Sequence, residues 1–498
     1  MSRKSRNNLS PSHYLGTWML PGGEHAVGDL ELRGASTLLR LHSDQPLPHF
    51  RSLAYLTGTA YTGENITLVD CLSPGMGITS FQDAPTRYHA EVFPHHVAVG
   101  RRFIDPTAHC VAGIHFSTTD LSTLFYDFDA FSSMVDAKPV IDEILRERRQ
   151  MRPVEAGQHP LVQYFTGRDC ICSVDTERGR VSVNHRPKYS LGGPQGVYIR
   201  NRIVVSLQPV EPVPFADAIE GMYDLHCFLS IAAGRAQGVR SIHITTTDKV
   251  NDVPISLAVY PSYRPKVSDR SEQRRPHPAD VPLDPIRHAE EFASVLADWI
   301  RRHSSWRIAR SQYLDCLRKA NRYGSERLVA AANMFDILPN EAVPSAYSLP
   351  AEFAATRDQC VALLREHPNG IDRNSALSAL GRLGRPSLPK KVAHRTSIVE
   401  SKTGEAFPDL QRVVSIAVKC RNYFVHGSSG EIEYSRVEAF LPLLTDALEF
   451  VFAASDLIDA GWDTDRWLSQ TGGWGHNFSR FRSNYGPAVE ALNKALAA

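Results

Sequence analysis

The pattern of hydrophobic and polar positions changes near residue 260. Before it, short alternating runs with many β-branched side chains predict strands, and Gly-Gly pairs and prolines predict the turns between them. A thick apolar face between residues 216 and 234 predicts one long helix. The first half is therefore expected to be a β-rich domain of sandwich or barrel type with one packed helix. Its clearest strand candidates are residues 37–41, 65–69, 197–199, 203–207 and 242–244.

After residue 286 apolar side chains recur at spacings of three and four, which predicts helices packed into an all-α bundle. The chain is thus expected to be an α+β protein of two domains. The β-rich domain would span residues 1–260 and the helical domain residues 286–498, joined by a linker at 261–285 that is rich in Pro, Arg, Ser and Asp. Further helices are expected over residues 305–321, 325–338, 351–366, 373–383, 408–426 and 431–459.

Composition restricts the partners and the compartment. The 498 residues exceed the size at which one core stops growing, which supports two domains. The formal net charge is +1, so any nucleic-acid site has to be a local patch. The eight scattered cysteines favour a reduced, cytoplasmic protein. The longest apolar run, residues 440–458, is interrupted by acids and predicts a buried helix instead of a membrane span. We expect no membrane partner, no cofactor and no metal.

Candidate chemistry gathers at the end of the helix predicted over residues 408–426. Asn422 and His426 lie four residues apart and share a helix face, and Arg421 stands beside that face. Arginine binds phosphate and stabilises charge on a pentacovalent phosphorus, and histidine transfers protons near neutral pH. RNA supplies its own nucleophile, the 2′-hydroxyl, so cleavage at such a site needs no metal. The structural alternative is an arginine that pairs with a neighbouring helix and a histidine that suits the helix dipole.

The spacing of this arginine and histidine is not specific by itself, because Arg180 and His185 in the β-rich half have the same spacing. What distinguishes the later segment is the predicted helix, the asparagine after the arginine and the glycine after the histidine. Three basic residues upstream, Lys390, Lys391 and Arg395, allow two interpretations. They either guide an RNA backbone by charge or form the solvated start of a helix.

At these residues the chain resembles the HEPN superfamily. The motif of that superfamily is an arginine, often followed by asparagine or another polar residue, and then a short spacer and a histidine, as in Arg421, Asn422 and His426. The segment 325–338 resembles the helix of ApeA-type HEPN proteins that carries an acidic residue, and Asp336 falls at that place, where the family usually has glutamate. The first half resembles the ApeA N-terminal domain in the order and spacing of its motifs, which are Gly16-x-Trp18-x-Leu20-Pro21, Gly28-Asp29-Leu30, Leu38, Gly58-Thr59, Ile66-Thr67-Leu68 and Gly113-Ile114-His115-Phe116.

The resemblance implies a bacterial antiphage protein of the abortive-infection kind, whose HEPN domain is an RNase toxin held inactive until infection. It implies catalytic roles for Arg421, Asn422 and His426, with Asp336 as a supporting acid. The implied partners are RNA, with tRNA as one candidate, a phage-derived trigger, and further copies of the chain in a homodimer or higher oligomer. The alternative hypothesis is a non-catalytic sensor or adaptor whose HEPN bundle dimerises and binds RNA or a phage component.

Overall fold

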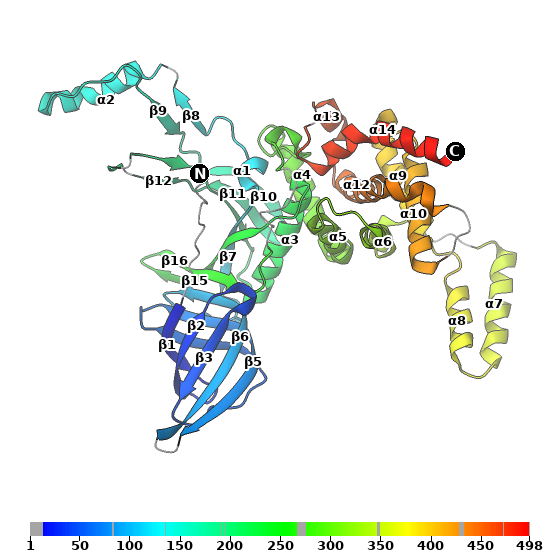
Figure 1. Cartoon of the computed structure of the whole chain (residues 1–498), viewed down its shortest axis with the longest axis horizontal. Helices are drawn as coiled ribbons and strands as arrows, with labels where there is room; N and C mark the ends of the chain where they lie inside the picture. The colour runs from blue at the N-terminus through cyan, green and yellow to red at the C-terminus, as the bar shows by residue number, and fades with distance from the viewer. Residues whose placement is uncertain are drawn as a thin grey trace. The chain divides into compact units, whose positions relative to one another are not determined.

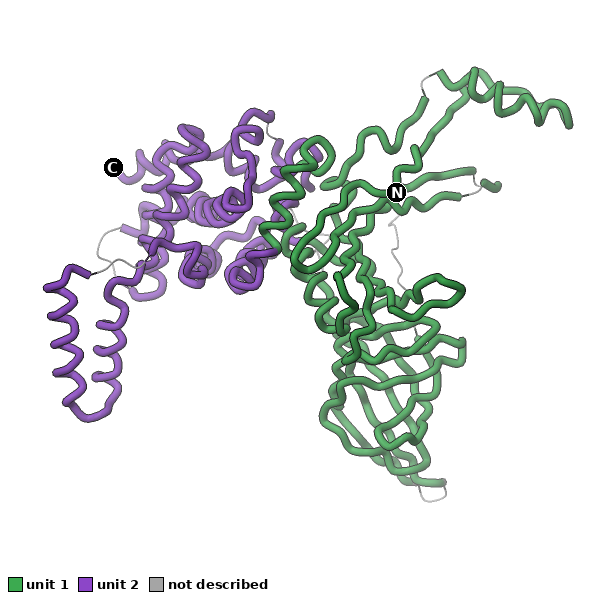
Figure 2. Tube along the Cα trace, turned by 180° about the vertical axis from the view of Figure 1, so that it is seen from behind, with its two compact units in different colours: residues 1–229, 237–269, 284–300 green, residues 230–236, 270–283, 301–498 purple. Residues whose placement is uncertain are grey.

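The computed structural model describes residues 13–81, 84–134, 136–190, 192–194, 196–265, 275–345, 349–427, 433–471 and 473–497. The chain forms two compact units (Figure 2). The first comprises residues 1–229, 237–269 and 284–300, and the second comprises residues 230–236, 270–283 and 301–498. Residues 266–274 of the predicted linker lie outside the described residues.

Helix α4 (Ala289–Arg301), which the hydrophobic pattern assigned to the helical domain, clusters with the strands up to residue 300. Its apolar face explains this grouping. The ring of Phe292 lies 5.7 Å from that of Phe125, and the ring of Trp299 lies 5.3 Å from that of Phe228. Edge-to-face aromatic pairs of this kind stabilise a contact beyond the apolar area that they bury.

The first unit is built on an antiparallel sheet that has twelve strands within the described residues (Figure 1). The strand order is β10-β11-β14-β7-β15-β16-β6-β3-β2-β1-β4-β5, and β5 also pairs with β6, so the last six strands close on themselves. The β-rich class predicted from the sequence is therefore confirmed. The strands are β1 (His13–Met19), β2 (His25–Glu31), β3 (Leu38–Ser43), β4 (Ser52–Ala60), β5 (Asn65–Phe81), β6 (Ala84–Gly100), β7 (Val111–Thr118), β10 (Cys170–Thr176), β11 (Gly179–His185), β14 (Ile203–Gln208), β15 (Val239–Val250) and β16 (Val253–Pro261).

Two small ribbons accompany this sheet, β8 (Phe131–Met134) with β9 (Val162–Phe165), and β12 (Lys188–Tyr189) with β13 (Ile199–Arg200). The predicted helix is α3 (Phe215–Ala233). Its residues up to 229 belong to the first unit, where a Cβ at Gly221 would lie 2.6 Å from Leu207 of β14. Glycine at this point lets the helix approach the sheet closely. The one-turn helix α1 (Leu121–Leu124) and the longer helix α2 (Lys138–Met151) also belong to the unit.

The core of the closed sheet surrounds Trp18, which is fully buried and donates its indole N–H to the carbonyl of Gly28 at 3.2 Å. Two glycines of the sequence motifs make room for the indole. A Cβ on Gly28 would lie 2.8 Å from the Trp18 ring, and a Cβ on Gly58 would lie 2.4 Å from it. Both distances are shorter than van der Waals contact, so a larger residue at either position would displace the tryptophan.

The second unit is helical, as predicted, with one correction. The single helix expected over residues 431–459 is wrong, because a 3₁₀ turn (Glu438–Phe440) separates α11 from α12. Pro442 lies in the first turn of α12, where its missing N–H costs no helical hydrogen bond. The helices are α5 (His303–Arg318), α6 (Ser325–Asp336), α7 (Ala351–Glu366), α8 (Ile371–Gly381), α9 (Leu388–Thr403), α10 (Leu410–His426), α11 (Tyr434–Val437), α12 (Leu441–Asp459), α13 (Thr464–Ser469) and α14 (Asn477–Ala497).

The acids that interrupt the apolar sequence of α12 form buried ion pairs. Asp456 accepts from Arg310 at 2.8 Å and from Arg302 at 2.7 Å, and Glu449 accepts from Arg327 at 2.7 Å. Burial raises the pKa of Asp456, but the two arginines outweigh this effect and lower the pKa to about 2. These pairs join α12 to α5 and α6, because a buried charge is tolerated only beside an opposite one.

Among the described residues, none of the helices combines the length and the hydropathy that a membrane crossing requires.

Candidate active site

Helix α10 carries the predicted residues in its last two turns. Its apolar face, which includes Leu410, Val413 and Ala417, is buried in the helical unit. The helix ends because Gly427 adopts a left-handed conformation with φ of 67° and donates its N–H to the carbonyl of Tyr423 at 2.9 Å. This is a common way to close a helix, and it requires the freedom of glycine. The polar face of the last turns of α10 lies beside the neighbouring helix α6.

Arg421 is held by side chains from both helices. Its Nε and Nη2 donate to Oδ1 of Asn333 at 3.2 and 2.9 Å, and its Nη1 donates to Oδ1 of Asn422 at 3.1 Å. Nη2 also lies 3.7 Å from a carboxylate oxygen of Asp336. The arginine side chain is only 14% exposed. The fold therefore fixes the direction of the guanidinium through two amides and one carboxylate.

His426 stands at the outer end of this arrangement. It is exposed, and its Nε2 lies 3.4 Å from Nη1 of Arg421. A guanidinium group donates hydrogen bonds and cannot accept them, so in this contact Nε2 of His426 is the acceptor.

Helix α6 contributes one residue that the sequence analysis did not identify. Asn333 and Asp336 are three residues apart, so they lie on the same face of α6 and both reach Arg421. Asp336 had been predicted as a supporting acid. In the sequence, the only indication for Asn333 is its place one helical turn before Asp336. Its contact with Arg421 depends on the packing of two helices that are far apart in the sequence.

Among the basic residues predicted to guide RNA, Lys391 is brought to this cluster. Its Nζ donates to the backbone carbonyl of Asp336 at 2.7 Å and lies 3.9 Å from the carboxylate. Lys390 is exposed on α9. Lys391 thus completes a group in which two cations, Arg421 and Lys391, flank one carboxylate.

Arg395 does not join the cluster, and its position is inconsistent with the predicted contact to an RNA backbone. Its side chain is buried, Nε donates to Ser455 at 2.9 Å, and Nη1 donates to Asp459 at 2.7 Å. The guanidinium also lies 5.1 Å from the centre of the Trp306 ring. These contacts hold Nε and Nη1 within the bundle, whereas the buried Nη2 has no hydrogen-bond partner among the described residues, so the side chain packs α9 against α12.

Within the described residues, the group of side chains that could hold a metal ion lies in the first unit and not in the cluster around Arg421. Donor atoms of His13, Asp29 and Glu31 all lie within 4.8 Å of one another. Glu31 is also 3.0 Å from Arg33 and 3.9 Å from Arg40. These arginines already offset the acidic charge of the group, so its charge does not require a metal ion.

Two family models match the chain. ApeA N-terminal domain 1 matches residues 13–299, more than half of the chain, and Apea-like HEPN matches residues 329–466. The chain belongs to the ApeA family. No curated protein and no solved structure matches it. The two matches follow one another in the order that the sequence motifs indicated, so the resemblance to an ApeA-like architecture is confirmed.

The ApeA match includes the strands of the sheet, and the HEPN match includes α9, α10 and α12. The match begins at residue 329, so Asn333 and Asp336 of α6 lie inside it together with the rest of the cluster around Arg421. At the level of the family, this architecture supports an antiphage effector with a HEPN domain of nuclease type.

Proposed function

We propose that this ApeA-type protein is an endoribonuclease that acts as an abortive-infection effector against phage. The observation that supports it best is the convergence of Arg421, Asn422 and His426 with Asn333 at the end of α10. This group combines a phosphate ligand, a proton acceptor and amides that orient the phosphate ligand. Those are the parts that cleavage of RNA through its own 2′-hydroxyl requires.

In the proposed reaction, Nε2 of His426 removes the proton of the 2′-hydroxyl, and the 2′-oxygen attacks the adjacent phosphorus. Arg421 stabilises the negative charge of the pentacovalent phosphorus. Asn422 and Asn333 orient the arginine. The bond from phosphorus to the 5′-oxygen breaks, and that oxygen takes up a proton. The products carry a 2′,3′-cyclic phosphate and a 5′-hydroxyl, and no metal-bound nucleophile is needed.

The proposal includes a homodimer or higher oligomer in which two copies of the motif face one cleft. In such a pair, the histidine of the second copy is available to protonate the leaving 5′-oxygen. Lys390, which is exposed on α9, and Lys391 contribute positive charge for the RNA backbone in this proposal. We further propose tRNA as a candidate substrate, the cytoplasm as the compartment, and control of the helical domain (286–498) by the β-rich domain (1–260) in response to a phage-derived trigger.

The test compares the wild type with His426→Ala, and with His367→Ala as a matched control at an exposed histidine of the same unit. Cells with and without phage are sampled, and RNA ends that carry a 5′-hydroxyl are sequenced. We expect such ends in the wild type and the control, and none in His426→Ala. Undiminished cleavage by a folded His426→Ala variant would refute the assigned role. Protection from phage that persists in His426→Ala would instead favour the non-catalytic adaptor.

A further inference from the structure

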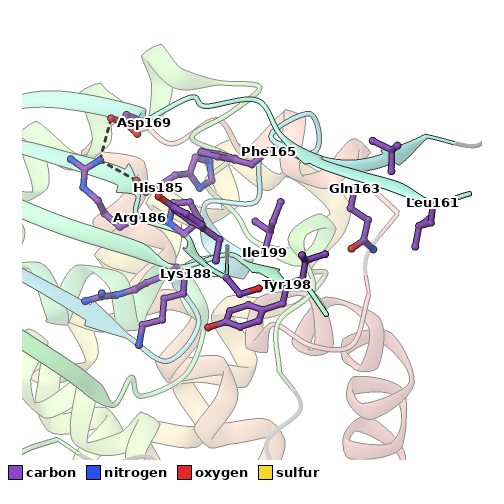
Figure 3. Close-up of a pocket in the computed structure, with 15 residues that line it drawn as sticks. Leu161, Gln163, Phe165, Asp169, His185, Arg186, Lys188, Tyr198 and Ile199 are labelled. Carbon is purple, nitrogen blue, oxygen red and sulfur yellow. Dashed lines mark hydrogen bonds and ion pairs between the residues drawn. The ribbon is translucent and has the colours of Figure 1, made fainter. Parts of the chain in front are cut away.

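The first unit contains an open cavity of about 910 Å³ between β9, the end of β11 and the ribbon of β12 and β13 (Figure 3). Large apolar side chains line it although they are well exposed: Val197 is 77% exposed, Leu161 66%, Tyr189 63% and Tyr198 55%. Apolar side chains that gather at an open surface mark a place where another molecule binds. A ligand of drug size buries most of its own surface in an enclosed pocket, which this open lining does not provide.

The cavity also carries positive charge. Arg186 is paired with Asp169 at 3.3 Å, a contact drawn as a dashed line in Figure 3. Lys188 and Arg202 line the same cavity and have no ion-pair partner within the part of the chain that the structure describes. Two uncompensated cations next to an apolar surface favour a partner that carries both apolar and acidic groups.

Unpaired strand edges lie in the same place. The ribbon of β8 with β9 and the ribbon of β12 with β13 are each two-stranded among the described residues. Every strand of such a ribbon has one edge whose backbone N–H and C=O groups form no ladder. An extended polypeptide can use such an edge for backbone hydrogen bonds while its alternate side chains enter the cavity.

The wall of the cavity contains a polar atom that the fold leaves unsatisfied. His185 is fully buried, and its Nε2 has no hydrogen-bond partner among the described residues. Its Nδ1 lies 3.3 Å from Oδ1 of Asn201, and its ring contacts Phe131 and Phe165 edge-on. Burial lowers the pKa of His185, so the ring is neutral at pH 7. Since buried polar groups are normally paired, this nitrogen is an exception in the wall of the cavity, although it has no accessible surface of its own.

We propose that this cavity binds an extended segment of another protein, in which apolar side chains alternate with acidic ones. Tyr189 and Tyr198 offer ring faces on which bases could stack, so the lining alone does not separate a peptide from single-stranded nucleic acid. The free strand edges favour a polypeptide over other anions. The inference rests on the first unit alone and does not depend on the proposed nuclease activity.

The experiment probes the full chain on an array of short random peptides and reads the composition of the peptides that bind. Wild type is compared with the double variant Lys188→Glu/Arg202→Glu and with Lys249→Glu, a matched control at an exposed lysine of β15 that does not line the cavity. We expect bound peptides to be enriched in Asp and Glu alternating with apolar residues. The double variant should lose this preference and bind the selected acidic peptides about tenfold more weakly, whereas the control should not.

A second variant, Val197→Asp, separates the apolar part of the site from the charged part. It should weaken the same peptides while its thermal unfolding midpoint stays unchanged, because the side chain is exposed. Peptide selection without acidic enrichment, or enrichment that survives the charge reversal, would overturn the proposal. Tighter binding of a labelled oligo(dT) probe that competes with the peptides would overturn it in favour of nucleic acid.

Discussion

Asn333 gives a direct test of how the fold prepares Arg421 for catalysis. Its Oδ1 accepts two N–H groups from the guanidinium, and Asn333→Ala removes this acceptor without changing the charge. A hydrogen bond to a charged group contributes about 1.5–3 kcal/mol, and water replaces it only partly because Arg421 is largely buried. A loss of about 2 kcal/mol in transition-state stabilisation corresponds to a rate about 30-fold lower.

The assay measures the initial rate at which the purified full-length chain produces 5′-hydroxyl ends on tRNA. Because Asn333 contacts Arg421 and its proposed role is to position that side chain, we expect the loss mainly in kcat and little change in KM. Asn333→Asp keeps an acceptor at the same place and should retain more activity than Asn333→Ala. Asn340→Ala, at an exposed position after the same helix, serves as the matched control and should cleave at the wild-type rate.

A wild-type rate in Asn333→Ala would refute the argument that this amide positions Arg421, provided that His426→Ala is inactive in the same assay. Loss of activity together with a lower unfolding midpoint would point to packing instead. The two variants of Asn333 therefore separate a positioning role from a structural one.

Two further predictions concern the buried charges of the helical unit. Arg310 and Arg302 lower the pKa of Asp456 to about 2, against the effect of burial. Ionised Asp456 therefore stabilises the folded state fully above the unfolded-state pKa of about 3.9, and this contribution is lost as the pH falls toward 2. Denaturant titrations should show this loss, on the order of 2 kcal/mol, and Asp456→Asn should remove this part of the pH dependence while lowering stability at pH 7. Arg395→Met should lower the thermal unfolding midpoint by several degrees and leave the salt dependence of RNA binding unchanged, and the opposite result would restore its predicted role at the RNA backbone.

The helix that carries Arg421 and His426 was predictable because amphipathic spacing and a terminal glycine are local signals. Asn333 was not, because it is 88 residues away in the sequence and only the packing of α6 on α10 brings it to the guanidinium. Local patterns state which face of a helix is polar. They do not state which two polar faces meet.

The hydrophobic pattern around Arg395 indicates that the side chain is buried, although its charge indicates exposure to solvent. Buried positions on α9 recur at Leu388, Val392, Arg395 and Val399, which are spacings of three and four. The arginine thus stands on the apolar stripe of its helix, where its neighbours predict burial. Its charge suggested solvent, but Asp459 and Trp306 supply partners that the sequence alone could not place beside it.

In the first unit, alternation predicted strands but not their order. Closure of the sheet depends on β5 returning along β6, which no local pattern specifies. The sequence motifs include Gly28 and Gly58 but do not indicate what these glycines do. Their role follows from the structure, since both lie against the ring of Trp18.

Within one chain, the fold holds Arg421 of the candidate site in place more firmly than His426. Arg421 is largely buried and held by Asn333, Asn422 and Asp336, so folding alone fixes the phosphate ligand. His426 is exposed in the last turn of α10, and its contact with the arginine is long, at 3.4 Å. The fold therefore constrains the side chain of His426 less than that of Arg421. It follows that, under the proposed mechanism, control of activity acts on the end of α10, through the arrival of RNA or of a second copy, and not on the arginine.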